Sequence, residues 1–205
     1  MKNNWKLRTI AYVVGLIILG LGISLVIEAS QGAGAWDALY VGLNKQFGLT
    51  VGTWLIIVGL VLVLINAILL KERLDWFAML TLLLLGWVVD FWLYIIINTW
   101  QPALYWEQIG LLLVGMIVMA VGVSIYLQAK FAPTSVDKLM YAIAHRTGFS
   151  LRVSKTIGEV IALAFAWIAG GPIGLGTVLI TFLVGPLVQF FIKRVEPLFA
   201  PRVKA

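Results

Sequence analysis

The acidic residues of this chain are few, and four of them stand where a carboxylate could bind a cation or carry a proton. Asp37 and Asp137 each begin a short polar segment, Asp90 lies in TLLLLGWVVDFWLYIII, and Glu159 lies in IGEVIALAF. A carboxylate in apolar sequence needs a positive partner, a hydrogen bond or water, and such residues commonly mark solute paths or proton relays in membrane proteins. These four residues and Gln189 are therefore the candidate substrate-binding or ion-binding residues.

The two polar segments, 34–48 and 134–148, each predict a short helix. Thr134 and Asp137 have the spacing of a capping box, and a glycine at the far end of each segment can adopt the positive φ that ends many helices. In one interpretation, the aspartates have a purely structural role and stabilise the free amides at a helix start. Alternatively, they bind a cation or a basic substrate group, which requires helices that re-enter the membrane rather than lie on its surface.

Asp90 and Glu159 also have structural alternatives. Asp90 is predicted near the middle of a span, where it carries a proton or a solute, or is a protonated acid hydrogen-bonded between helices. With a slip of one residue, Gln189 is the counterpart of Asp90 in the second half of the chain, so the two side chains could face each other. Glu159 lies one helical turn beyond Lys155, and an ion pair on the helix surface is the simpler alternative to solute contact.

The composition indicates that membrane helices position these residues. Of 205 residues, 62% are hydrophobic and 12% are charged, and the mean hydropathy is +1.03. A soluble fold of this size could not bury so much apolar surface, so lipid is the expected solvent. The sequence predicts an all-α membrane protein, a single integral domain over residues 1–205 with six transmembrane helices. The six spans are approximately Thr9–Ala29, Val51–Leu70, Trp76–Ile97, Ile109–Gln128, Val153–Gly170 and Thr177–Ile192.

The chain contains an internal duplication at an offset of 100 residues. Ten residues between positions 14 and 57 recur identically one hundred positions later, Asp37 and Gly48 among them. Repeat one covers about 9–98 and repeat two about 109–192, and each holds three spans and one short connector helix. Because three is odd, the second repeat must enter the membrane from the opposite side. The duplication therefore predicts two inverted three-helix repeats, an architecture found in many transporters.

The basic residues indicate how the spans are oriented. Fourteen of the fifteen Lys and Arg residues lie at the termini and in alternate connecting segments, whereas Lys45 alone lies on the other side. The positive-inside rule therefore predicts that both termini are cytoplasmic. The basic residues form no single patch, so nucleic acid is not an expected partner.

Several kinds of chemistry are not expected from this sequence. The chain has no cysteine and a single histidine, His145, so neither a thiolate centre nor a histidine metal site is predicted. The glycine-rich segment PIGLGT lacks the Lys-Ser/Thr ending of a phosphate loop. No nucleophile is paired with a base, and no pair of carboxylates has a recognisable catalytic spacing. We therefore expect neither an enzyme nor a cofactor.

Four motifs are distinctive: GLGISL and GAGAWDALYVGL in the first half, and DKLMYAIAHRTGFSLRVSKTIGEV and GGPIGLGTVLITFLVGPLVQFF in the second. In these motifs the chain resembles the YczE/YyaS/YitT family of bacterial integral membrane proteins, most closely the YczE-like branch. The chain departs from the family pattern at Ala35, where Pro is frequent, in the wider spacing from Pro133 to Asp137, and at Lys155, where Arg is common. The resemblance implies a multi-pass protein of the bacterial cell membrane, and it implies no particular activity.

Two functional hypotheses follow. The first is a secondary transporter or permease for a small polar or amphipathic solute, coupled to protons through Asp90 or Glu159. The alternative is a non-transporting membrane factor that binds a partner protein or lipid and uses its buried acids only to fix packing. The lipid bilayer is a partner under both hypotheses, whereas a solute and protons are partners only under the first.

Overall fold

A computed structural model describes residues 5–97, 102–131 and 134–199, and every regular element within these residues is a helix. Pro133 and Asn98, the last residue of repeat one, lie outside the described residues. The first half holds α1 (Trp5–Glu28), α2 (Ala35–Phe47), α3 (Val51–Leu70), α4 (Trp76–Asp90) and a π-helical continuation η1 (Phe91–Ile96). The second half holds α5 (Tyr105–Leu127), α6 (Ser135–Thr147), α7 (Leu151–Ile168) and α8 (Leu175–Phe199).

Both halves share one order of elements: a long helix, a helix of 13 residues, and two more long helices. Five helices are long and apolar enough to cross a membrane, namely α1, α3, α4 with η1, α5 and α8. The remaining predicted span, Val153–Gly170, corresponds to α7, which has 18 residues but carries Arg152, Lys155 and Glu159. The all-helical prediction is confirmed for the described residues, and α7 as a sixth span stays a prediction.

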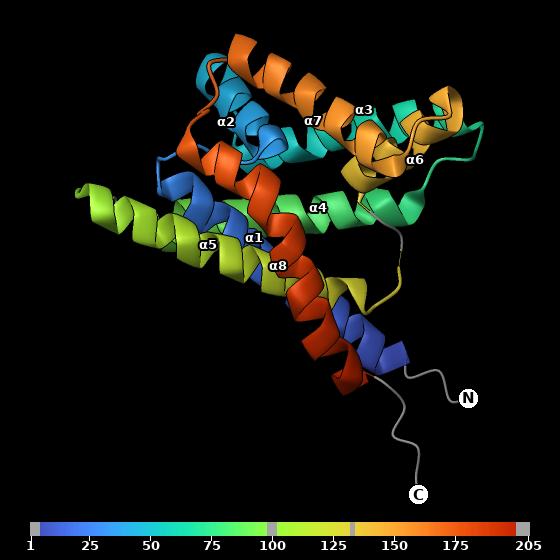
Figure 1. Ribbon diagram of the computed structural model, residues 1–205, viewed down its shortest axis with the longest axis horizontal. Helices are drawn as coiled ribbons and strands as arrows, with labels where there is room; N and C mark the ends of the chain where they lie inside the picture. The colour runs from blue at the N-terminus through green and yellow to red at the C-terminus, as the bar shows by residue number, and fades with distance from the viewer. Residues whose placement is uncertain (1–4, 98–101, 132–133, 200–205) are drawn as a thin grey trace, which may run out of the picture.

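α1 and α5 lie side by side along the centre of the molecule and run antiparallel to each other (Figure 1). Glycines on both helices bring the two backbones together, because an added Cβ would meet atoms of the facing helix. The contacts are Gly15 with Tyr126, Gly22 with Met119, Gly115 with Val26, and Gly122 with Leu19. The contacts form two matched pairs at the offset of 100 residues: the contact of Gly15 with Tyr126 matches that of Gly115 with Val26, and the Gly22 contact matches the Gly122 contact. The helix pair therefore has a local two-fold axis.

The other helices pack around this pair. α4 packs on α1 and α8 on α5, while α2 packs on α7 and α6 on α3. Figure 1 shows α7 running between α6 and α2, on the side of the molecule away from α5. The most deeply buried large side chains are Leu16, Val26, Leu112 and Met116, so the core lies along the α1–α5 contact. One packing differs between the halves, because α3 packs against α4, whereas α8 diverges from α7 and crosses α5 (Figure 1).

The short helices α2 and α6 begin and end as the sequence predicts. Thr134 is the N-cap of α6, and its Oγ1 accepts a hydrogen bond from the Asp137 N–H at 3.2 Å. Gly34 precedes α2, and it supplies no side chain for a cap. Both helices end at a glycine with positive φ, 71° at Gly48 and 73° at Gly148. The N-cap at Thr134 and the glycine ends of both helices are thus confirmed, whereas the Asp137 carboxylate accepts from the Thr134 hydroxyl and completes no capping box in the described residues.

Candidate solute-binding site

A pocket of about 80 Å³ lies where α2, α6 and α7 meet. Its polar and aromatic lining comes from all three helices, with Trp36 on α2, Asp137 on α6, and Ser154, Lys155 and Glu159 on α7. The first turns of the two short helices therefore reach the same pocket, although the bodies of α2 and α6 lie towards opposite ends of α7 (Figure 1).

The sequence of α7 explains how its polar residues reach this pocket. Small residues recur at every fourth position along one buried face: Ser154, Gly158, Ala162 and Ala166. Residues four apart share a helix face, so this stripe lets α2 and α6 pack closely against α7. Glu159 directly follows Gly158, and its side chain enters the pocket at the edge of the stripe.

Asp137 combines a capping contact with a place in the pocket lining. Thr134 Oγ1 donates a hydrogen bond to Asp137 Oδ2 at 2.8 Å. This contact occupies one of the two carboxylate oxygens. The structural and the ligand-binding interpretations of Asp137 are therefore compatible with each other.

Asp37 lies at the matching position of α2 in a different environment. Burial, and secondly the negative charge of Glu159, raise the pKa of Asp37 from 3.8 to about 7. Tyr40, one turn further along α2, is fully enclosed, and burial together with Asp37 and Glu159 raises the pKa of its hydroxyl. Asp137 also interacts electrostatically with Glu159. The structure thus places two of the predicted residues, Asp137 and Glu159, in one pocket lining, and Asp37, which is not part of that lining, interacts electrostatically with Glu159.

Glu159 has no close partner in the described part of the chain. It accepts no hydrogen bond there, and the ion pairs within 4.0 Å are both made by Lys138. Lys155 is exposed and interacts with Glu159 only at longer range, so the predicted contact ion pair is not formed. Nor does any group of three Asp, Glu or His side chains in residues 5–97, 102–131 and 134–199 suit a metal ion.

Asp90 is the last residue of the 15-residue α4 and lies within the apolar span Trp76–Ile96, whose bounds agree with the predicted third span to one residue. The Gly52 N–H donates to Asp90 Oδ1 at 2.7 Å, and Thr50 Oγ1 donates to Oδ2. Both oxygens act as acceptors at the start of α3, where the positive helix end stabilises a carboxylate. Asp90 therefore joins α4 to the start of α3 through hydrogen bonds with Gly52 and Thr50.

Gln189 is exposed on α8, and no hydrogen bond joins it to Asp90 in the described residues. The predicted juxtaposition of these two side chains is not observed. Trp36 and Ser154, in contrast, line the pocket and were not predicted as site residues. The only sequence signals for them were the position of Trp36 beside Asp37 and the four-residue spacing of Ser154 with the small residues of α7.

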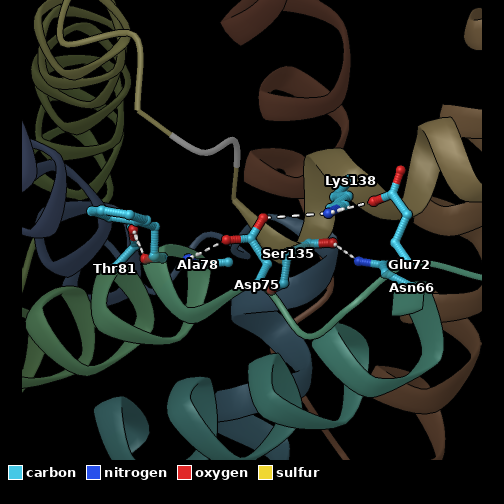
Figure 2. Close-up of polar contacts among 8 residues, drawn as sticks. Asn66, Glu72, Asp75, Ala78, Thr81, Ser135 and Lys138 are labelled. Carbon is cyan, nitrogen blue, oxygen red and sulfur yellow. Dashed lines mark hydrogen bonds and ion pairs between the residues drawn. The ribbon is translucent and has the colours of Figure 1, made fainter. Parts of the chain in front are cut away.

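A second polar cluster lies where α6 meets α3 and the start of α4 (Figure 2). Lys138 Nζ contacts Glu72 Oε2 at 3.1 Å and Asp75 Oδ2 at 3.3 Å. Asp75 is also the N-cap of α4, because its Oδ1 accepts from the Ala78 N–H at 3.1 Å. Burial alone lowers the pKa of Lys138, but the hydrogen bonds and charges of Glu72 and Asp75 outweigh it and raise the pKa. The cluster thus ties α6 to the loop between α3 and α4.

Asn66 extends this cluster into the buried interface. Asn66 Nδ2 donates to the backbone oxygen of Ser135 at 2.8 Å, as Figure 2 shows. Within the described residues, Asn66 Oδ1 and Ser135 Oγ are buried and have no hydrogen-bond partner. A lone asparagine in the apolar run VLVLINAILL was the sequence signal for this contact.

Comparison with known proteins establishes the family of the chain. Residues 6–193 match DUF6198, a family of unknown function. The chain is 36% identical to YyaS of Bacillus subtilis over 185 residues, which cover 90% of this chain and 92% of YyaS. It is also 36% identical to the membrane protein YczE of the same organism over 197 residues, covering 95% of this chain and 89% of YczE. No solved structure matches. The chain belongs to the DUF6198 family, and the YczE/YyaS resemblance is confirmed; with its apolar helices it is a multi-pass membrane protein.

Proposed function

We propose that this member of the DUF6198 family is a secondary transporter for a small polar or amphipathic solute, with the pocket between α2, α6 and α7 as its solute site. The observation that carries the proposal is a pocket whose lining brings Asp137 of α6 and Glu159 of α7 together with Trp36 of α2, while Asp37, the residue after Trp36, interacts electrostatically with Glu159. Two of these residues lie a hundred positions apart at the starts of matching short helices. Transporters commonly bind their solutes between two repeats, at the ends of interrupted helices.

The contacts between α1 and α5 support inverted repeats. Their antiparallel glycine contacts follow a local two-fold axis, which two inverted repeats would produce. Contacts at the helix ends lie in similar places: Arg8 donates to the Ala129 carbonyl oxygen beyond α5, and its counterpart Gln108 accepts from Gln31, which lies two residues beyond the counterpart of Ala129. In this proposal α7 is the sixth span, and its charged residues face the pocket and the membrane surface.

The short helices support a re-entrant arrangement. Thirteen residues make about 20 Å of helix, which is too short to cross the hydrocarbon core. Since the first turns of α2 and α6 reach one pocket, we infer that the two helices enter from opposite faces and meet within the membrane. Their positive N-terminal ends then offset part of the cost of placing Asp37 and Asp137 there.

The positive-inside rule places both termini in the cytoplasm, and a pH gradient across the membrane would then act on the pocket acids. In this proposal Glu159 carries the proton, because it lines the pocket and accepts no hydrogen bond from the described residues. A proton on Glu159 would lower the negative charge at the site and weaken its hold on a cationic group. Coupling therefore follows from competition between a proton and a solute.

Flux into proteoliposomes tests the proposal. The purified protein would be reconstituted at one copy per vesicle and offered radiolabelled methylammonium, glycine, succinate and glucose, with and without a pH gradient. We expect uptake of at least one solute above that of protein-free vesicles, and loss of that uptake in Glu159→Gln. Glu196→Gln is the matched control, because Glu196 is an exposed carboxylate on α8 and is not part of the pocket lining. Absence of uptake for all four solutes would overturn the proposal.

A further inference from the structure

The pocket contains polar groups that the protein itself leaves unsatisfied. Ser154 is fully buried, lines the pocket, and has an Oγ with no hydrogen-bond partner in the described residues. Glu159 has neither a hydrogen bond nor an ion pair within 4.0 Å there. Burying an unpaired hydroxyl or carboxylate costs free energy, because each loses its contacts with water. A ligand that donates hydrogen bonds to both groups would recover part of this cost.

The remaining lining favours a positive charge. Asp137 adds a second carboxylate, with one oxygen outside its capping contact with Thr134. Trp36 supplies an aromatic wall, and the face of an indole attracts cations. Lys155 also lines the pocket, but its side chain is exposed and can extend to the surface. The two carboxylates of the lining therefore face the cavity with a single, displaceable cation nearby.

We propose that this pocket binds a small hydrogen-bonding organic cation, a guanidinium or a primary alkylammonium ion, between Trp36, Asp137, Ser154 and Glu159. Binding of the cation does not depend on the proposed transport function. Only its movement across the membrane would rest on that function. A cavity of about 80 Å³ has room for roughly two or three water molecules, so the occupant is small. The ligand must donate hydrogen bonds from several of its sides, because Asp137 lies on α6 whereas Glu159 and Ser154 lie on α7.

Binding of radiolabelled guanidinium to the purified full-length protein in detergent tests this inference. We expect saturable binding that unlabelled methylammonium displaces. Urea, a neutral molecule of the same planar shape, should not compete if charge decides binding. Tetramethylammonium, a cation without N–H donors, should compete poorly if hydrogen bonding decides it. Sodium at the same concentration should also fail to displace the label, and displacement by sodium would overturn the assignment to an organic cation.

Variants connect the binding to the pocket. Glu159→Gln and Asp137→Asn should each weaken guanidinium binding about tenfold or more, the usual effect of losing one charge-assisted hydrogen bond. Ser154→Ala removes a single buried hydroxyl and no charge, so it should fold normally and weaken binding about fivefold. Glu196→Gln should bind like the wild type. The inference fails if binding is absent from the wild type, or if Ser154→Ala and Glu159→Gln both bind normally.

Flux measurements separate this inference from the transport proposal. Pocket-dependent guanidinium binding without uptake of any solute would support the cation site and overturn transport. Uptake of glycine, succinate or glucose by a protein that does not bind guanidinium or methylammonium would support transport and overturn the cation site. Pocket-dependent guanidinium binding with uptake of methylammonium would support both.

Discussion

The interface between α2 and α7 and the interface between α6 and α3 each join one half of the chain to the other and are counterparts at the offset of 100 residues, but they are built from different contacts. Small residues bring α2 and α7 together: Ala35, Ala38, Ala166 and Ala169 are all buried. At the corresponding interface, polar groups join α6 to α3, where Asn66 binds the Ser135 backbone and Lys138 bridges Glu72 and Asp75. Ala35, Ala38 and Ala166 are the counterparts of Ser135, Lys138 and Asn66 at the offset of 100 residues.

The difference indicates which interface opens more easily. Close packing of alanine and glycine cannot be separated without creating voids, and each void costs packing energy. Polar contacts can exchange their partners for water, and the unpartnered atoms of Asn66 and Ser135 would gain hydrogen bonds by doing so. We therefore expect the α2–α7 interface to be rigid and the α6–α3 interface to be the one that admits water.

The largest effect is expected from enlarging a residue at the end of the rigid interface. A Cβ added at Gly171 would overlap the backbone oxygen of Ala38 on α2. Gly171→Ala should therefore lower the unfolding free energy by about 3 kcal/mol, the upper end for overpacking, because a backbone oxygen cannot rotate away. The melting temperature in detergent, followed by tryptophan fluorescence, measures the change. Gly185→Ala is the control, since no atom lies within 4 Å of its added Cβ, and equal melting temperatures for the two variants would contradict the rigid interface.

A pH-dependent effect on stability is expected at Asp37, on helix α2 of the rigid interface. Its pKa is raised from 3.8 to about 7, by burial first and by Glu159 second, so between these values the folded protein holds a proton that the unfolded chain releases. The unfolding free energy of the wild type therefore falls as pH rises through this window, and the loss is complete above about pH 7. Asp37→Asn does not titrate there, so its stability relative to wild type should rise by about 2 kcal/mol between about pH 5 and about pH 8.

Melting temperatures of both proteins at the two pH values check this prediction. Glu159 and Tyr40 face Asp37 and change their own interactions in the variant, so Glu159→Gln serves as a comparison. The Asp37→Asn effect should be smaller in that background, because the second cause of the raised pKa is removed. A relative stability that is constant with pH would show that Asp37 is not the titrating group.

The sequence predicted the helices well because their signals are local. The glycines at 48 and 148, the cap at Thr134 and the offset of 100 residues placed α2 and α6 correctly. The hydrogen bonds of Asp90 could not be predicted from local sequence signals. Its partners depend on the close approach of α4 to the start of α3, where Gly52 lies against Gly86 and Asp90. Such a contact is a property of helix packing and leaves no periodic pattern near Asp90.

The candidate site was only partly predictable for the same reason. Glu159 stands out as an acid in apolar sequence and Asp137 as the counterpart of Asp37, but Ser154 matters only because α7 presents it to a pocket shared with two other helices. Lys138 looks like an ordinary basic residue of a surface helix until Glu72 and Asp75 are placed beside it. A residue whose role depends on a distant partner gives no sign of that partner in its own segment.

A moderate effect on stability is expected at Lys138, in the polar interface between α6 and α3. Lys138→Met removes the cation between Glu72 and Asp75, and it should cost about 1 kcal/mol because Glu72 is half exposed and water replaces part of the contact. Hydrogen exchange should speed up in α6 and stay unchanged in α2. Lys45→Met, at the end of α2, is the matched control for losing one lysine charge. Faster exchange in both short helices after Lys138→Met would contradict the independent opening of the polar interface.

The smallest effect is expected from making the polar interface resemble the rigid one at a single position. Asn66→Ala copies its counterpart Ala166; it loses the hydrogen bond to Ser135 and also removes the unpartnered Oδ1. These changes oppose each other, so the unfolding free energy should change by less than about 1 kcal/mol. Water access is the more sensitive measure, because without the amide fewer polar groups remain to hold water between α3 and α6. Hydrogen exchange in the first turn of α6 should therefore slow, and faster exchange there would show that the Asn66 contact holds this interface closed.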